Sequence, residues 1–134
     1  MVQSQEQWLK IGILARRSEV TIDTVRYYER RGLLSPARRL ASGYRLYSEN
    51  TVARIRLARR LQGLGMTLDE VAEALRAHDR GDATCQSERW RLEAVRDRLQ
   101  ARLAELDAIR EDLESVLARC SSGHCDLRDP AGTK

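Results

Sequence analysis

The chain has 134 residues, no phenylalanine and few other aromatic residues, so its length allows one small domain with an appendage rather than two full-sized domains. It contains neither an apolar run of about 18 residues nor a basic-then-apolar N-terminal leader, so we expect a soluble, cytoplasmic protein without membrane contact. The three cysteines, an odd number, do not make a disulfide framework. In a reducing compartment such thiols are more often metal ligands or redox groups.

The positive charge is concentrated in the first part of the chain. Residues 1–78 contain 14 Lys and Arg against 8 Asp and Glu, whereas residues 79–134 contain 10 against 12. A basic front half indicates a polyanionic partner such as DNA. On charge alone the indication is weak, because many protein surfaces are rich in arginine.

Two short helices are predicted after a flexible segment at residues 1–7. Apolar residues recur at helical spacing from Ile11 to Ala15, and Thr21 is a suitable N-cap for a second helix over 22–31. Residues 18–20 form the turn between them, and Val25 is expected to face inward. Two helices joined by a tight turn indicate a helix-turn-helix, although a generic helical hairpin fits this pattern as well.

A small hairpin is predicted next. Pro36 prevents further helix, and residues 37–40 and 44–47 alternate basic and apolar side chains on either side of an Ala-Ser-Gly turn. We call this hairpin the wing. Its basic side chains are those of Arg38, Arg39 and Arg45.

Two more helices complete the front of the chain. Ser48 is the expected cap of a helix that runs to about Gln62. The capping-box pair Thr67 and Glu70 predicts another helix over 68–77, followed by a linker at 79–84. For the arginines of the third helix, a solvated outer face is the expected role; they are Arg54, Arg56, Arg59 and Arg60.

A heptad pattern dominates the last third of the chain. Leucines recur every seven residues, apolar residues fill most of a second position, and no Pro or Gly falls between 81 and 123. This pattern predicts a long helix over 85–119 that pairs with another helix. We call the apolar row the seam; its leucines are Leu92, Leu99, Leu106 and Leu113. Continued by seven residues in each direction, this row reaches Cys85 and Cys120.

The two cysteines of the seam lie 35 residues apart, or roughly 50 Å along a helix, so they cannot share a ligand within one chain. In an antiparallel pair of chains, however, Cys85 of one would lie beside Cys120 of the other, next to His124 and Cys125. A simpler reading is that buried cysteines pack as small apolar residues. It explains less well why a third cysteine follows a histidine in a Gly-containing turn.

Four sequence motifs resemble the MerR family of transcription regulators. In chain order they are IGILA (11–15), TVRYYERRGLLSP (24–36), GYRLY (43–47) and GMTLDEV (65–71). The long helix with its seam cysteines resembles the metal-sensing branch. The resemblance implies a mainly α fold: a winged helix-turn-helix DNA-binding domain (8–78), an antiparallel coiled-coil dimerisation helix (85–119), a short C-terminal metal-binding loop (120–127) and a disordered tail (128–134).

The resemblance also implies how such a homodimer acts on double-stranded promoter DNA. It would bind a palindrome within a promoter whose spacer is too long, and its ligand would make it distort that DNA into an active shape for RNA polymerase. Thr24 and Arg26 would approach the major groove from the recognition helix, together with Tyr27. The wing would grip phosphates through Arg38, Arg39, Tyr44 and Arg45. One of the adjacent residues Tyr27 and Tyr28 is expected to pack in the core instead, and Glu19 stands where the family usually has glycine.

The three cysteines match the family's sensors of divalent ions, because sensors of monovalent ions have serine at the position of Cys85. Three thiolates suit mercury or lead, and the addition of His124 would give a tetrahedral set suited to zinc or cadmium. The loop between Cys120 and Cys125 is shorter than usual, so His124 either completes the set or faces solvent. The expected function is activation of metal resistance or efflux genes.

Three other functions fit parts of the sequence. A dithiol switch between Cys120 and Cys125 would give a redox regulator of the same fold. A DNA-organising protein without an effector would explain the basic half but not the thiols. An enzyme that uses Cys125 with His124 as base lacks an orienting third group, so we predict no catalytic activity.

Overall fold

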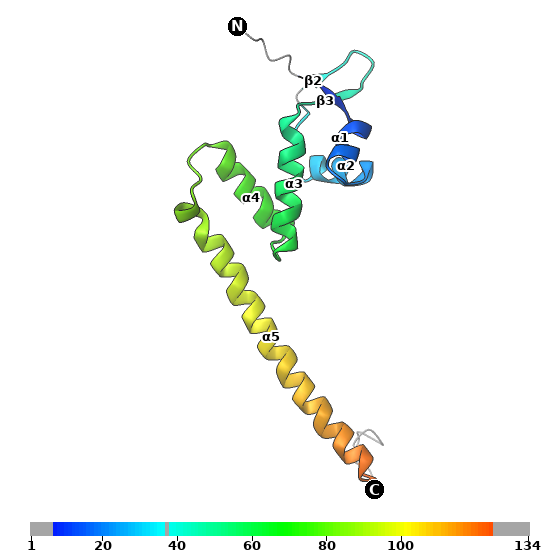
Figure 1. The fold of residues 1–134 in the computed structure, drawn as a ribbon, viewed down its shortest axis with the longest axis vertical. Coiled ribbons are helices and arrows are strands. Elements are labelled where there is room, and N and C mark those ends of the chain that lie inside the picture. Colours follow the sequence, from blue (N-terminus) through cyan, green and yellow to red (C-terminus); the bar gives the residue numbers. More distant parts are fainter. Residues whose placement is uncertain (1–6, 37, 125–134) are drawn as a thin grey trace. The chain divides into compact units, whose positions relative to one another are not determined.

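The computed structural model describes residues 7–36 and 38–124 and is mainly helical (Figure 1). It divides into two compact units between Leu92 and Glu93. Within the described residues no helix is both long and apolar enough to cross a membrane. In chain order the elements are β1 (Leu9–Lys10), α1 (Ile11–Arg17), α2 (Ile22–Arg30), β2 (Arg38–Arg39), β3 (Arg45–Tyr47), α3 (Asn50–Gly63), α4 (Leu68–Asp79) and α5 (Cys85–Ser121).

The predicted helix-turn-helix is confirmed in α1 and α2. Thr21 caps α2, because its side chain accepts the backbone N–H of Thr24 at 3.1 Å, and Val25 is completely buried. In the turn, Glu19 has a φ of +59°, so the tight turn is kept with glutamate in a conformation that favours glycine. Such a conformation costs a non-glycine residue on the order of 1 kcal/mol.

The wing is a three-stranded antiparallel sheet with the order β1-β3-β2. Arg38 pairs with Leu46 and Arg39 with Arg45, which confirms the predicted hairpin. On the other edge of β3, Leu9 pairs with Tyr47. The strand β1 was not predicted, because two residues are too short to show an alternating pattern.

In the first unit, α3 lies between the α1–α2 pair and α4 (Figure 1). It begins one residue later than predicted: Glu49 rather than Ser48 occupies the cap position, and the carbonyl of Ser48 accepts the N–H of Thr51 at 3.0 Å. Its inner face is completely buried at Ile55 and Ala58. The large, completely buried side chains of the core are Tyr47, Leu14, Leu33, Ile55, Leu75, Val25 and Val71.

The capping box predicted for α4 is present, with Thr67 and Glu70 each bonding the other's backbone N–H at 3.2 Å. The helix runs two residues past the predicted end, to Asp79. Residues 80–84 then lead to α5, and the first compact unit extends over the first eight residues of that helix, to Leu92.

The predicted long helix is α5, which ends two residues beyond the predicted 119. At its start, Thr84 and Ser87 each bond the other's backbone N–H, at 3.0 and 2.9 Å. At its end, Gly123 has a φ of +90° and donates to the carbonyl of Cys120 at 3.2 Å, while His124 donates to that of Arg119 at 2.9 Å. These two bonds are those of a Schellman motif. Both ends of α5 are therefore fixed by local hydrogen bonds, and each end bears a cysteine.

Candidate nucleic-acid interface and metal-ligating residues

The candidate recognition helix is α2, and its outer face presents the predicted DNA contacts. Arg26 is exposed, Tyr27 is 39% exposed, and Thr24 is half-buried with its hydroxyl 2.9 Å from that of Thr21. Tyr28 is the tyrosine that packs: it is buried, its hydroxyl donates to Gln62, and burial raises its pKa against the lowering effect of the Arg59 charge. The expectation that one of the two tyrosines belongs to the core is confirmed.

The end of α2 has a cationic edge built around Tyr27. The guanidinium carbons of Arg30 and Arg31 lie 5.8 and 6.0 Å from the centre of its ring, within the range of a cation–π contact. Arg31 also binds Asp69 of α4 at 2.6 Å. Tyr27 therefore helps to hold two arginines beside the candidate DNA-binding face of α2.

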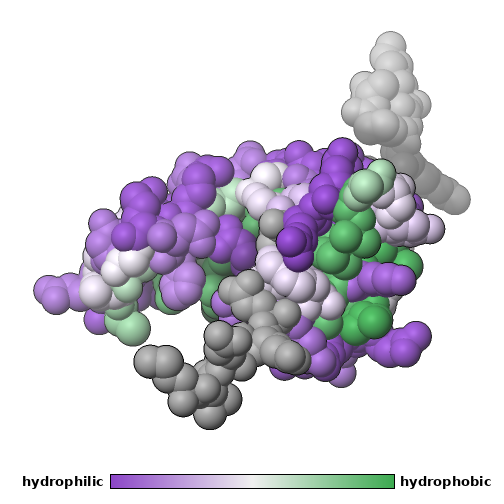
Figure 2. Space-filling view, turned by 90° about the horizontal axis from the view of Figure 1, so that it is seen from above, coloured by the Kyte–Doolittle hydropathy of each residue, from purple (hydrophilic) through white to green (hydrophobic). Residues whose placement is uncertain are grey.

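The four predicted phosphate contacts of the wing, Arg38, Arg39, Tyr44 and Arg45, are all exposed. Arg39 and Arg45 are directly opposite each other on adjacent strands, so their side chains lie on one face of the sheet. The charge of Arg45 is paired with Glu29 at 2.7 Å, so repulsion between the two arginines is reduced and a phosphate on this face would be attracted mainly by Arg39. The space-filling view shows hydrophilic residues over most of the visible face, interrupted by apolar patches (Figure 2).

Glu29 connects the recognition helix to the wing. Its carboxylate binds Arg45 at 2.7 Å and accepts the hydroxyl of Tyr47 at 2.6 Å. Burial, together with the Glu29 carboxylate, raises the pKa of Tyr47 to about 12. No local sequence pattern predicts this connection, since Glu29 lies 18 residues from Tyr47. The two contacts of Glu29 fix the position of β3 relative to α2.

The predicted metal ligands lie at the two ends of α5. Cys85 is exposed at its first residue, Cys120 is half-buried at its last but one, and His124 is exposed just beyond the helix. The predicted ligand Cys125 lies outside the described residues. Within residues 7–36 and 38–124 the chain brings no three His, Cys, Asp or Glu side chains together as a metal site. The described candidate ligands of one chain therefore lie at opposite ends of α5, too far apart to bind one ion together.

Two family models match this chain. The first, described as "MerR HTH family regulatory protein", matches residues 9–78, and the second, "MerR, DNA binding", matches residues 52–116. The chain belongs to the MerR family. Together the two matches cover the winged helix-turn-helix and most of α5, so this MerR protein is a DNA-binding transcription regulator rather than an enzyme.

Named relatives of this MerR protein include regulators of metal resistance. The mercuric resistance operon regulatory protein of Bacillus cereus is 37% identical over 83% of this chain and 84% of its own length. The transcriptional regulator ZntR of Escherichia coli K12 is 32% identical, with 88% of each chain covered. The crystal structure of the regulator PbrR691 from Ralstonia metallidurans CH34, solved in complex with lead(II), superposes with a TM-score of 0.75 at 32% identity over 82% of this chain and 85% of that one.

Three arginines of α3 make contacts that the sequence did not predict. Arg60 does lie outward, but the guanidinium groups of Arg54, Arg56 and Arg59 each bind a backbone carbonyl of another segment. Helical spacing could not reveal this, because an arginine that reaches a neighbouring carbonyl has the same sequence pattern as one that faces solvent. Arg56, Arg59 and Arg60 are exposed, as expected, whereas Arg54 is half-buried, and the carbonyl contacts of Arg54, Arg56 and Arg59 were not predicted.

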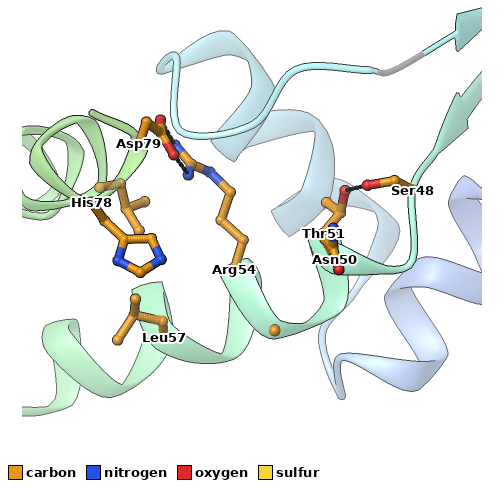
Figure 3. A pocket seen from close by; sticks show the side chains of 9 residues that line it. Ser48, Asn50, Thr51, Arg54, Leu57, His78 and Asp79 are labelled. Carbon is orange, nitrogen blue, oxygen red and sulfur yellow. Dashed lines mark hydrogen bonds and ion pairs between the residues drawn. The ribbon is translucent and has the colours of Figure 1, made fainter. Parts of the chain in front are cut away.

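A pocket of about 430 Å³ between α3 and α4 was also missed (Figure 3). The imidazole of His78 and the side chain of Leu57 face each other across it, and Arg54 reaches Asp79 at its rim. No cluster of ligand-type residues in the sequence marked this place, since its lining comes from two helices. It is lined by Ser48, Asn50, Thr51, Ala53, Arg54, Leu57, Leu75, His78 and Asp79.

Proposed function

We propose that this MerR protein is a metal-responsive activator. As a homodimer it binds a palindromic operator, and capture of a divalent thiophilic ion makes it distort the promoter so that RNA polymerase transcribes metal resistance or efflux genes. The single observation behind this proposal is the position of Cys85 and Cys120 at opposite ends of one apolar seam. The mercury, zinc and lead named for its relatives support the class of effector.

Dimerisation is supported by the exposure of the seam. Leu92, Leu99, Leu106 and Leu113 are between 47% and 55% exposed in the single chain. Removing the exposed half of each leucine from water would contribute roughly 1 kcal/mol per side chain. An antiparallel partner covers this row and places the two helix ends of different chains together.

The donor set fits a soft divalent ion. Antiparallel pairing brings Cys85 of one chain to Cys120, Cys125 and His124 of the partner subunit, which gives three thiolates with or without an imidazole. Thiolates select soft ions such as mercury, cadmium, lead and zinc. The capping bonds around Thr84 and Gly123 favour binding, because Cys85 and Cys120 then lose little conformational freedom when they ligate.

The ion would act by linking the two chains. Ligation ties the start of one α5 to the end of the other, which favours one angle between the two DNA-binding modules. A ligand shifts such an equilibrium only by its difference in affinity for the two states. Deforming the promoter costs free energy that depends on its sequence, so the angle between the two modules is coupled to DNA shape.

The proposal is tested by transcription in vitro from the protein's own operator with mercury, cadmium, lead, zinc and copper(I). We expect induction by one or more divalent ions, and loss of that induction in Cys85→Ser, Cys120→Ser and Cys125→Ser while operator affinity is retained. Full induction in any of these variants removes that thiol from the ligand set. His124→Gln separates the two donor sets: the three-thiolate site keeps its metal affinity, and the site with an imidazole does not.

Measurement of the amount of metal bound to the purified protein separates this function from a thiol switch. Protein purified with reductant should bind one metal ion at each proposed site, where the start of one α5 meets the end of the partner's. A response to oxidant by protein without metal would instead indicate a disulfide between Cys120 and Cys125. Binding to DNA without sequence preference in a footprinting assay would favour an effector-independent DNA-organising protein.

A further inference from the structure

Two arginines of α3 bind the helix-turn-helix from behind. Arg56 donates from Nη2 to the carbonyl of Arg17 at 2.9 Å, and Arg59 donates from Nη1 to the carbonyl of Glu19 at 2.9 Å. The two acceptors are the last residue of α1 and the middle of the turn that leads to α2. The end of α1 and the turn after it are thus each held at one backbone carbonyl by one face of α3.

The Arg17 carbonyl lies at a place where a cationic donor is favourable. The last carbonyls of a helix have no partner within that helix, and its C-terminal end bears partial negative charge. The α1 helix has only seven residues, so its end makes up much of its length. The side chain of Arg17 returns to Glu49 at the start of α3 at 2.7 Å, which gives a third connection between the same two segments.

The contact of Arg59 with Glu19 stabilises a residue in an unfavourable backbone conformation. Its φ of +59° is unfavourable for a residue with a side chain, and its carbonyl is the one that Arg59 binds. A charge-assisted hydrogen bond contributes more than a neutral one and can offset strain of this size. Two residues later Thr21 caps α2, so the conformation of Glu19 decides the direction in which the recognition helix begins.

We propose that Arg56 and Arg59 are positioning residues for operator recognition: they hold the turn between α1 and α2 and so set the orientation of the recognition helix, and they do not bind phosphate. This inference rests on the proposed function, in that α2 reads the operator. The rival role for two exposed arginines in a basic domain is direct phosphate contact.

The two roles differ in their salt dependence. Removal of one phosphate contact lowers the slope of log affinity against log salt by about one and weakens binding to all sequences alike. Removal of a positioning residue leaves the slope and the non-specific affinity unchanged. It weakens only the binding that requires α2 to meet particular bases.

Arg60 supplies a matched control. It lies on the same helix next to Arg59, it has the same charge and is exposed, and its guanidinium group makes no hydrogen bond or ion pair within the described residues. The variants R56A, R59A and R60A therefore change the net charge equally. Only R56A and R59A lose a hydrogen bond to the end of α1 or to the turn after it.

The experiment uses the full-length protein with two DNA duplexes, measured by fluorescence anisotropy over a range of salt concentrations. One duplex is selected by the wild-type protein from a random pool, and the other has the same composition in shuffled order. We expect R56A and R59A to bind the selected duplex about tenfold more weakly than R60A, as fits the loss of one charge-assisted bond. Their affinity for the shuffled duplex and their salt slopes should equal those of R60A.

A second substitution tests the role of strain. Glycine adopts a positive φ without cost, so E19G in the R59A background should restore most of the affinity for the selected duplex, and E19G alone should change little. This double variant also keeps the test informative if R59A unfolds, which circular dichroism will show.

Three results would overturn the inference. A salt slope lowered by about one in R59A, with equal loss on both duplexes, would make Arg59 a phosphate contact. Identical behaviour of R59A and R60A would show that the turn does not need Arg59. A wild-type protein that selects no sequence would overturn the proposed function and this inference together, and that result is visible before any variant is made.

Discussion

Arg54 and Asp79 form a bidentate ion pair, with Nη1 2.6 Å from Oδ1 and Nη2 3.0 Å from Oδ2 (Figure 3). The same guanidinium group donates from Nε to the carbonyl of Leu33 at 2.6 Å. Arg54 therefore joins the end of α4 to the segment that follows the recognition helix. The residues after Asp79 lead to Cys85, so this contact lies between the proposed ligand and the proposed DNA-reading element.

The Arg54 contacts predict unequal effects of two substitutions on stability. Asp79→Asn removes a pair whose carboxylate is half exposed, and we expect a loss of about 0.5–1 kcal/mol in the free energy of unfolding. Arg54→Ala also leaves the Leu33 carbonyl without its donor, so the loss should reach about 1–2 kcal/mol. Denaturant unfolding at one fixed protein concentration measures both losses, because the proposed dimerisation would make stability depend on concentration. Equal losses would show that the Leu33 contact contributes nothing.

The Tyr47 hydroxyl predicts a loss of stability at high pH. Its pKa in the folded protein is about 12, against an ordinary value of 10.0, because the ring is buried and the hydroxyl binds Glu29. The unfolded chain therefore loses this proton first. The stabilising contribution is complete below pH 10 and disappears as the pH rises to about 12.

Comparison of Tyr47→Phe with the wild type isolates this contribution. The variant should lose about 1.5 kcal/mol at neutral pH, since the hydroxyl no longer donates to Glu29. The difference in stability between the two proteins should shrink as the pH rises above 10. Tyr44→Phe is the control, because Tyr44 is 66% exposed and its removal should change neither value. A constant difference up to pH 12 would contradict the role of Tyr47.

The seam predicts a variant that separates dimerisation from folding of the first unit. Leu99→Glu places a charge in the middle of the apolar row, and we expect the proposed homodimer to dissociate in sedimentation equilibrium. Ala101→Glu is the control: it adds the same charge two residues along, off the seam, and should remain dimeric. A dimeric Leu99→Glu protein, or a wild-type monomer, would disprove the antiparallel pairing.

The fold of the first unit could be predicted because its signals are local. The cap at Thr21, the capping box of Thr67 and Glu70, and the turn at Gly43 each depend on residues within a few positions of one another. The heptads of α5 are likewise a pattern within one segment. Only the ends of these elements shifted, by one or two residues, as at Ser48 and Asp79.

The contacts that position the site could not be predicted, because they join residues distant in the sequence. Arg59 lies 40 residues from Glu19, and Glu29 lies 18 from Tyr47. A solvated arginine and one that reaches a carbonyl of another segment have the same helical spacing. The proposed metal ligands are the opposite case: residue type and heptad position indicated them, and the proposed set is completed only by a second chain.

The Schellman motif at the end of α5 predicts an effect on metal affinity from a residue that is no ligand. Gly123 has a φ of +90°, so Gly123→Ala strains the turn by about 1 kcal/mol and weakens the bond to the carbonyl of Cys120. The end of the helix should then fray and the Cys120 thiol lose its fixed position. Because the ion must order that segment again on binding, we expect metal affinity to fall by about fivefold to tenfold in competition with a chelator, with no change in operator affinity. Ser122→Ala, which removes only an exposed hydrogen bond to Arg119, is the matched control. Unchanged affinity in Gly123→Ala would mean that the ion organises this turn at no cost, and that the order of the end of α5 does not contribute to metal binding.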